Sequence, residues 1–590
     1  MDLPTVWGAS SVRKGADWWV HPRVGAAPHA GPPLSRGPPG SRGRALRGWA
    51  QGAGQPPGVP SRPPLSVVSR LGLGLLSVPL LALSFPDADQ GWLAWVALVP
   101  LIGACRGSPL KTAFLLGSAW GAAAAVLLFS WIFTLPEFRW YHGLILAAYL
   151  GAYLGLWCTA LAWLTRSRRA VVFAAPAFWV ALDYLKAHAG FLSAPWASLA
   201  HSQHADLAVL QIASLTGEYG VTFLVVMANV ALAELWMAPR RWRAPACALA
   251  AVALVHLWGA WVLAGASGSP RLRVAAVQPS IPLTLTKNQT GLAARVQRLE
   301  RLTMRAAAVQ PDLIVWPETA LRDLAIHPVL ARRVADLARR SGASLVAGAS
   351  EFVKFQPGAT AFRPGARSYN AAYLVTPDGA FSRPYRKMRL VPFGEYLPLE
   401  GGMPWPAWLV PGVLKVLPGD RRLTWTLPGG LQILPLICWE NLFPDFVRRG
   451  VQRGARVIVQ LTNDNWFGRS AAPRQHNLAS VLRAVENRRP VVIASNTGPS
   501  QIIGPRGRVL AESGELFTQD VIGAVVPVGP PGQTVYTRFG DIFVLLVFAW
   551  LMAVVWWRPR AFSAWRARWS ESRKRGVERT PAQDLFEEVP

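Results

Sequence analysis

The chain contains a series of long apolar segments that an ordinary water-soluble domain does not have. Between about Leu65 and Ala266 these segments follow one another with only short polar breaks. The third has no charged residue between Lys111 and Glu137, and the seventh has none between Arg243 and Arg271. Either is long enough to cross roughly 30 Å of hydrocarbon as a helix. The sequence therefore predicts transmembrane helices.

We place seven spans in this half of the chain and one near its end. With eight spans, all five Arg- and Lys-rich stretches fall on one face of the membrane, which the positive-inside rule assigns to the cytoplasm. The segment 267–540 then lies on the opposite face of a bacterial-type cytoplasmic (inner) membrane, the periplasmic or extracytoplasmic side. The predicted spans lie near 66–85, 91–105, 112–135, 143–164, 170–187, 219–238, 245–265 and 542–557.

The net charge of +29 admits two interpretations. A basic surface can bind nucleic acid by releasing counterions from phosphates, but the chain has no zinc-finger spacing and no aromatic RNA-binding signature. Its Arg residues instead cluster beside the apolar segments, where they face anionic lipid. We therefore expect a membrane protein with no nucleic-acid partner.

Composition divides the chain into five regions. A Pro-, Gly- and Arg-rich extension cannot bury a core and is predicted to be disordered. It is followed by the helical domain of seven spans, an extracytoplasmic domain, the final span and a cytoplasmic tail. Their bounds are 1–63, 64–266, 267–540, 541–558 and 559–590.

Apolar runs in the extracytoplasmic domain alternate with segments of helical spacing, which is typical of a sheet covered by helices. The fold class is thus multidomain, with an all-α transmembrane bundle of about eight helices and an α/β domain. Helices are expected over 293–308, 444–453 and 473–489. Strands are expected over 273–278, 313–316, 344–349, 371–375, 431–438, 457–461 and 491–495.

Three residues of this domain form a chemically complete set for acyl transfer without histidine, metal or cofactor. Cys438 follows an apolar strand and has no obvious disulfide partner; a thiolate attacks acyl carbons but needs a base or a lowered pKa to form. Glu318, after a Trp-Pro turn, can take and return protons. Lys387 can stabilise the thiolate and an oxyanion.

Each residue also has a simpler explanation. A cysteine that ends an apolar strand is more often an inert core residue. Glu318 can cap the following helix, and Lys387 lies in a basic stretch that can be a solvated strip. Spacing in the sequence does not show that the three side chains converge.

The joint pattern adds weight, because Glu318, Lys387 and Cys438 occur in an order and in flanking motifs that resemble the nitrilase (carbon–nitrogen hydrolase) superfamily. That resemblance covers about 271–528 and implies an αββα sandwich. With spans on both sides of it, the chain from residue 64 onward resembles the apolipoprotein N-acyltransferase family. Matching stretches are YRKMRLVPFGEYLP (385–398), LTNDNWFG (461–468) and PVVIASNTGPSQIIG (490–504).

The resemblance implies a two-step reaction. Cys438 attacks the sn-1 ester of a membrane phospholipid and becomes a thioester, and the α-amino group of a diacylglyceryl-cysteine apolipoprotein then takes the acyl chain. It further implies that Glu318 is the general base and that Lys387 stabilises the oxyanion. Glu395 matches a second essential glutamate that orients Lys387 or assists the proton. Beside the nucleophile, Glu440 matches another family glutamate, and Trp439 stands where the family often has Tyr.

Two rival functions remain open at this stage. A membrane-bound amidase or hydrolase of the nitrilase type uses the same residues, with water as the acceptor. A scaffold or receptor without activity uses the domain only for binding, although the joint presence of Glu318, Lys387, Glu395 and Cys438 speaks against it.

Other features have less direct interpretations. Lys287 is followed by Asn288 where the family commonly has Trp. The loop 401–413, with Trp405 and Trp408, is interpreted either as a lid or as an interfacial anchor. His201 and His204 lack a third metal ligand and are expected to be loop polar groups, and the acidic residues at span ends are expected to be paired within the bundle. These are Asp183, Glu218 and Glu234.

Overall fold

A computed structural model describes residues 66–556, apart from 136–137, 168–169, 266–269, 283–289, 325–326, 354–366, 411–414 and 530. The predictions for the extension 1–63, the tail 559–590 and the Lys287–Asn288 pair lie outside the described residues.

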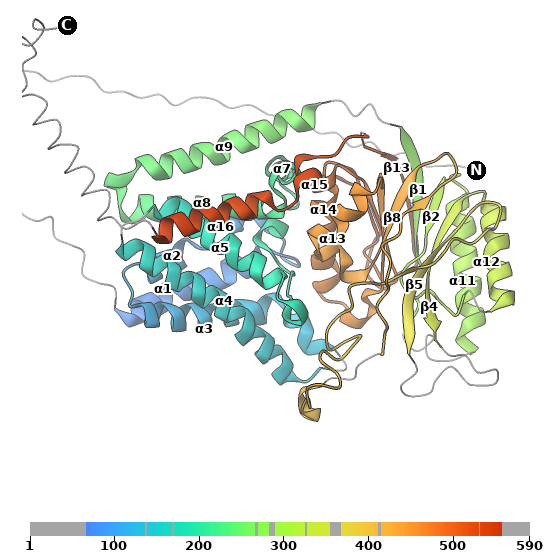
Figure 1. The fold of residues 1–590 in the computed structure, drawn as a ribbon, viewed down its shortest axis with the longest axis horizontal. Coiled ribbons are helices and arrows are strands. Elements are labelled where there is room, and N and C mark those ends of the chain that lie inside the picture. The colour runs from blue at the N-terminus through green and yellow to red at the C-terminus, as the bar shows by residue number, and fades with distance from the viewer. Residues whose placement is uncertain are drawn as a thin grey trace, which may run out of the picture. The chain divides into compact units, whose positions relative to one another are not determined.

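The first half of the chain forms a bundle of apolar helices (Figure 1). A helical segment lies over each of the eight predicted spans, and four helices, α3, α4, α8 and α9, are long and apolar enough to cross a membrane. The segment 91–105 differs from a single helix, because a 3₁₀ turn, η1, precedes the short α2. The bounds are α1 Val67–Leu83, η1 Gly91–Trp95, α2 Val99–Cys105, α3 Leu110–Leu128, α4 Trp140–Arg166, α5 Val171–Ala187, α8 Glu218–Met237, α9 Arg243–Ala264 and α16 Ile542–Trp556.

Helices α3 and α4 approach closely through glycine. A Cβ on Gly117 would lie 2.7 Å from the Cβ of Cys158, and one on Gly151 would lie 2.5 Å from the carbonyl oxygen of Ser118. Small residues allow apolar helices to pack through backbone contact where lipid provides no hydrophobic drive. Shorter helices fill the loops of the bundle: η2 Ser130–Thr134, η3 Gly190–Leu192, η4 Leu199–Gln203, α6 Leu207–Leu210, α7 Ala213–Thr216 and η5 Pro239–Arg241.

The acidic residues at the span ends are paired, and not only within the bundle. Asp183 pairs with Lys186 at 2.8 Å, and Glu234 pairs with Arg106. Glu218 reaches Arg483, outside the bundle, at 2.6 Å. Glu218 also contacts His201 of the bundle at 3.2 Å, so it has a partner inside the bundle and one outside it.

The segment between α9 and α16 contains two sheets. One has the strand order β13-β1-β2-β4-β5-β6, with β3 paired to β4, and the other has the order β12-β11-β10-β9-β8-β7. Strands β1, β2 and β4 run parallel, as do β8, β9 and β10. The strands are β1 Arg271–Gln278, β2 Leu313–Val315, β3 Leu321–Arg322, β4 Ser344–Phe352, β5 Ser368–Val375, β6 Tyr385–Arg386, β7 Trp425–Thr426, β8 Gln432–Ile437, β9 Val457–Thr462, β10 Val491–Ser495, β11 Gln501–Ile503, β12 Val509–Glu512 and β13 Asp520–Pro527.

The sheets pack face to face and helices cover their outer faces (Figure 1). Helices α11 and α12 cover the first sheet, and α13 and α14 cover the second on the side of the bundle. Strands buried on both faces are continuously apolar, as β2 is. This αββα arrangement confirms the predicted fold class. The helices and turns are α11 Thr290–Ala307, α12 Pro328–Ser341, η6 Ala407–Leu409, η7 Cys438–Leu442, α13 Pro444–Gln452, η8 Asp464–Phe467, α14 Ala472–Asn487 and α15 Val535–Phe539.

Candidate active site

Cys438 is placed by the sharp turn that ends β8. The strand stops at Ile437, and Cys438 is the first residue of η7 with a left-handed φ of 55°. Residues other than glycine rarely adopt this backbone conformation, which is found at functional sites where the surroundings enforce it. Cys438 as a residue is half-buried and packs against the core between the sheets.

Glu318 enters the site from the end of β2 through the Trp316-Pro317 turn. Its side chain is buried, and Oε1 accepts a hydrogen bond from Asn370 Nδ2 at 2.5 Å. The turn lies directly against β4, where a Cβ on Gly348 would lie 2.1 Å from the Pro317 carbonyl oxygen. Glycine at 348 thus leaves room for the backbone that carries Glu318.

Lys387 follows the short strand β6 and is 1% exposed. Its Nζ lies 2.8 Å from Glu395 Oε1 and 3.7 Å from Glu318 Oε1. The other oxygen of Glu395 accepts from the backbone N–H of Val391 at 2.8 Å. The structure therefore brings the Lys387 ammonium close to two carboxylates that lie 77 residues apart in the chain.

Burial and charge set the protonation of these groups. Burial raises the pKa of Glu318, against the opposing effect of Lys387. Burial and the neighbouring Glu318 raise the pKa of the Cys438 thiol, and Lys387 acts in the opposite direction. Burial alone disfavours the Lys387 ammonium, but Cys438, Glu395 and Glu318 outweigh it and raise the pKa of Lys387. The resting site thus holds a thiol, a stable ammonium and a carboxylate with increased proton affinity.

Glu440 anchors the turn that carries Cys438. Its Oε2 accepts from Tyr385 Oη at 2.7 Å and from the Ile437 N–H at 2.8 Å. Its Oε1 accepts from the N–H groups of Met388 and Arg389 at 2.8 and 3.1 Å. Glu440 therefore links the Cys438 turn to the segment that follows Lys387. Its two carboxylate oxygens together accept four hydrogen bonds from the protein.

Trp439 projects from the same turn toward the segment after Lys387. Its indole N–H donates to the carbonyl oxygen of Arg389 at 2.5 Å, and its ring meets Phe443 edge-on at 5.2 Å. The site residues predicted from the sequence are thus brought into one neighbourhood: Glu318, Lys387, Glu395, Cys438, Trp439 and Glu440.

The sequence did not reveal Asn370 or Asn441. Asn370 lies on β5, its side chain holds Glu318, and its carbonyl oxygen accepts from the Lys387 N–H at 2.8 Å. Asn441 is fully buried inside η7. The sequence around neither asparagine contains a motif that marks it, because the partner of each lies on a strand, turn or helix far away in the chain.

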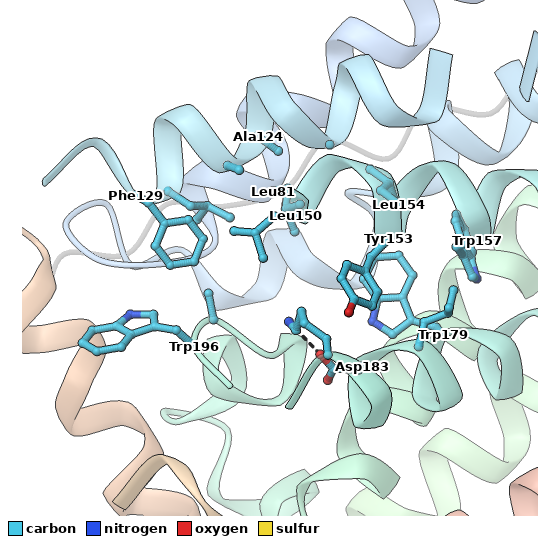
Figure 2. Close-up of a pocket in the computed structure, with 16 residues that line it drawn as sticks. Leu81, Ala124, Phe129, Leu150, Tyr153, Leu154, Trp157, Trp179, Asp183 and Trp196 are labelled. Atoms are coloured by element: carbon cyan, nitrogen blue, oxygen red, sulfur yellow. Dashed lines mark ion pairs between the residues drawn. The ribbon is translucent and has the colours of Figure 1, made fainter. Parts of the chain in front are cut away.

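A separate cavity of about 120 Å³ lies inside the bundle (Figure 2). Trp196 stands at one end, and Tyr153, Trp157 and Trp179 surround the other, beside the Asp183–Lys186 ion pair. Small-molecule sites usually enclose about 300–1,000 Å³. Its lining contains no member of the Glu318, Lys387 and Cys438 set, so this cavity is not the candidate site.

Metal and disulfide chemistry have no support in the part of the chain that the structure describes. No group of three or more His, Cys, Asp or Glu side chains there could hold a metal ion. His201 and His204 each pair with a carboxylate, Glu218 at 3.2 Å and Asp89 at 3.3 Å. All four cysteines are free thiols.

Comparison with known proteins identifies both halves of the chain. Residues 77–231 match the family model described as the apolipoprotein N-acyltransferase N-terminal domain, and residues 273–529 match the carbon-nitrogen hydrolase model. A solved structure of Saccharomyces cerevisiae Nit3, a member of branch 10 of the nitrilase superfamily, is 20% identical and covers 50% of this chain and 99% of its own, with a TM-score of 0.34.

Curated relatives extend the match over most of the chain. The apolipoprotein N-acyltransferase of Geobacter metallireducens is 35% identical over 80% of this chain and 92% of its own length. That of Gloeobacter violaceus is 33% identical over 79% of this chain and 89% of its own. With these matches, this chain belongs to the apolipoprotein N-acyltransferase family.

Proposed function

We propose that this protein transfers a fatty acyl chain from a membrane phospholipid to the N-terminal α-amino group of a diacylglyceryl-cysteine apolipoprotein. The observation that carries the proposal is the pair of contacts from Lys387 to Glu318 and Glu395, beside the half-buried residue Cys438. The described residues of the same chain include four helices long and apolar enough to cross a membrane.

In the first half-reaction, Glu318 takes the proton of the Cys438 thiol and the thiolate attacks the sn-1 ester carbonyl carbon of the phospholipid. The raised pKa of Glu318 suits a group that must both accept and return a proton. Lys387 lies where its ammonium can stabilise the oxyanion of the tetrahedral intermediate. The carbon–oxygen ester bond then breaks and Glu318 protonates the departing alkoxide. Lysophospholipid is released, and the acyl chain remains on Cys438 as a thioester.

In the second half-reaction, the α-amino group of the apolipoprotein attacks the thioester carbonyl carbon. Glu318 takes a proton from the attacking nitrogen, and the carbon–sulfur bond breaks as the amide forms. That proton returns to the Cys438 thiolate, so the enzyme is restored. Glu395 positions Lys387 throughout through the 2.8 Å contact.

Both substrates are embedded in lipid, which favours an enzyme fixed to the membrane. Exposing an acyl chain to water costs about 0.8 kcal/mol per methylene. We place the region 267–540 on the periplasmic face of the inner membrane, between seven spans in 64–266 and a last span in 541–558. The loop around Trp405 and Trp408 supports a location at the lipid surface, because the Trp408 side chain is 61% exposed.

A transfer assay in detergent tests the activity against the amidase alternative. Purified protein is mixed with phospholipid and a diacylglyceryl peptide, and the masses of the Cys438 peptide and of the products are followed. Transfer yields an acyl adduct on Cys438 and then a triacylated peptide. Free fatty acid as the sole acyl product would support hydrolysis instead. Cys438→Ala should give neither product, whereas Cys247→Ala, which changes an exposed thiol elsewhere, should retain both.

Thiol labelling tests the proposed orientation. In a Cys247→Ala background, Glu515→Cys introduces a thiol in the region 267–540 and Lys111→Cys introduces one in the first turn of α3. A membrane-impermeant maleimide added to spheroplasts should label position 515 and not position 111. The reverse pattern would overturn the orientation.

A further inference from the structure

Helix α14 carries a stripe of buried polar side chains that the proposed reaction does not use. His476, Ser480, Arg483 and Glu486 are spaced three or four residues apart and are each at most 1% exposed. This spacing places them along one side of a helix. Helix α14 packs on the second sheet and on the bundle within one apolar cluster, so the stripe runs between the two.

One end of the stripe holds the turn that carries Cys438. Asn441 Nδ2 donates to Ser480 Oγ at 2.9 Å and to the His476 carbonyl oxygen at 3.0 Å. Because that amide nitrogen faces a carbonyl, Asn441 Oδ1 is the atom that faces His476 Nε2, at 3.0 Å. Arg483 Nη1 contacts the Asn441 carbonyl oxygen at 3.4 Å. Three residues of α14 thus contact Asn441 in the turn that carries Cys438.

The other end of the stripe is bound to the first residue of α8. Arg483 Nη2 lies 2.6 Å from Glu218 Oε2 and 2.9 Å from Glu486 Oε1. The backbone N–H of Glu218 donates to Glu486 Oε1 at 2.9 Å. Burial raises the pKa of Glu486. Removing one partner from such a buried charge group leaves the others uncompensated.

A second contact joins the bundle to the same helix. The Trp196 ring stacks on His476, with ring centres 5.3 Å apart and planes 22° apart, and its indole N–H donates to Gln475 at 3.2 Å. His476 Nδ1 also lies 3.1 Å from Asp464 Oδ1. The residue that holds Asn441 is therefore packed against a loop of the membrane bundle.

We infer that α14 is a positioning element. It couples the packing of the membrane bundle against α14, through Glu218 and Arg483, to the position of Asn441 and the Cys438 turn. The inference rests on the proposed function, since it takes Cys438 to be the nucleophile. It assigns Glu218, Arg483 and Asn441 as positioning residues, whose effect reaches the reaction through Cys438. A displaced turn moves the thiol out of its buried position between Glu318 and Lys387, whose charges act on its pKa in opposite directions.

A double-mutant cycle on the full-length protein in detergent tests this coupling. Glu218→Gln, Asn441→Ala and the double variant are compared for the single-turnover rate of Cys438 acylation by phospholipid. We expect Glu218→Gln to be about 10-fold slower and Asn441→Ala about 100-fold slower, the scale expected when a reacting group is misplaced. The double variant should be no slower than Asn441→Ala, because both changes break one path.

The pH dependence of Cys438 alkylation by iodoacetamide, resolved by peptide mass, gives a readout that stability alone does not move. In Glu218→Gln the profile should shift to lower pH, because a displaced thiol loses burial and the Glu318 charge, which raise its pKa more than Lys387 lowers it. The matched control is Arg506→Ala, which removes another contact with the bundle, to the Gly265 carbonyl oxygen at 2.5 Å, without a path to the Cys438 turn. It should retain the wild-type rate and profile.

The outcomes separate the two proposals. Additive effects in the double variant, or an unchanged acylation rate in Glu218→Gln, would overturn the coupling. Equal slowing by Arg506→Ala would overturn it as well, because any loosened contact would then suffice. A wild-type protein that forms no adduct on Cys438 would overturn the proposed function itself.

Discussion

At the scale of single residues, the site separates two carboxylates by their distance from one ammonium. Lys387 lies 0.9 Å closer to Glu395 than to Glu318, from 2.8 and 3.7 Å. The nearer carboxylate is held as a counter-ion, with its other oxygen on the backbone. The farther one keeps a raised pKa and is left available for proton transfer. Two substitutions that act on Glu318 in opposite directions test this division.

Asn370→Ala should move the acid limb of the pH–rate profile for Cys438 acylation to higher pH. The Asn370 hydrogen bond lowers the pKa of Glu318, so its loss raises that pKa further. Glu318 can act as a base only as the carboxylate, which is protonated as the pH falls through its pKa. In the variant this pKa is higher, so the loss of activity begins at a higher pH. On the limb the rate should be about 10-fold lower, equivalent to a net hydrogen bond of about 1.4 kcal/mol. Stopped-flow acylation across pH measures it, and a limb that does not move would contradict the role of Asn370.

Glu395→Gln should move the same limb to lower pH. The charge of Glu395 raises the pKa of Glu318, so a neutral amide lowers it. The plateau rate should also fall by about 10- to 100-fold, because Lys387 loses its closest anion and its fixed position. A limb that stays in place or moves to higher pH would contradict the effect of the Glu395 charge on Glu318.

The sequence predicts the identity of these residues better than their contacts. Glu318, Lys387 and Cys438 can be found because each stands in its own motif, and acyl-transfer chemistry needs all three types. Asn370 cannot be found in this way, since its position opposite Lys387 depends on the pairing of β5 with β6. Long-range strand register is absent from local spacing.

At the scale of helices and strands, β4 controls where Glu318 can lie. Gly348→Ala should displace the Pro317–Glu318 backbone, because the new Cβ would lie 2.1 Å from one backbone atom and 2.9 Å from another. Overpacking of this kind costs about 1–3 kcal/mol of stability. We expect lower thermal stability together with slower acylation.

A matched strand glycine separates crowding from a general effect of alanine. A Cβ on Gly523 of β13 has its nearest neighbour at 3.5 Å, an ordinary contact. Gly523→Ala should therefore leave both the melting temperature and the acylation rate near the wild-type values. Equal losses in the two variants would contradict the role of Gly348.

Buried strands, the long apolar helices and the helices α11, α13 and α14 could be predicted from sequence, but α12 and the shortest strands could not. The apolar residues of α12, such as Leu330, Val334 and Leu337, lie among arginines and give no continuous apolar signal. Strands β6 and β7 have two residues each, too few for any periodicity. Helix α14 was predicted, although the buried polar stripe it carries became visible only from its packing against the bundle.

At the scale of the whole molecule, the second sheet and the bundle share one core. Residues of α8 such as Val221 and Leu224 lie in the same cluster as Phe446 and Leu482 of α13 and α14. A fragment 270–540 expressed alone would expose this surface together with the charges of Arg483 and Glu486. We expect it to aggregate without detergent, as measured by light scattering after size exclusion. A monodisperse fragment that unfolds cooperatively would contradict a shared core.

The ion pair between Glu218 and Arg483 also has a consequence for biogenesis. Its two members are separated by 265 residues, which a ribosome adds in about 10–50 s at roughly 5–20 residues per second. Glu218 thus reaches the bilayer well before its arginine exists, and the nascent chain must keep that carboxylate hydrated in the meantime. A position at the very tip of α8, next to water, meets this demand, whereas a position one or two turns deeper would leave an unpaired charge in hydrocarbon during translation.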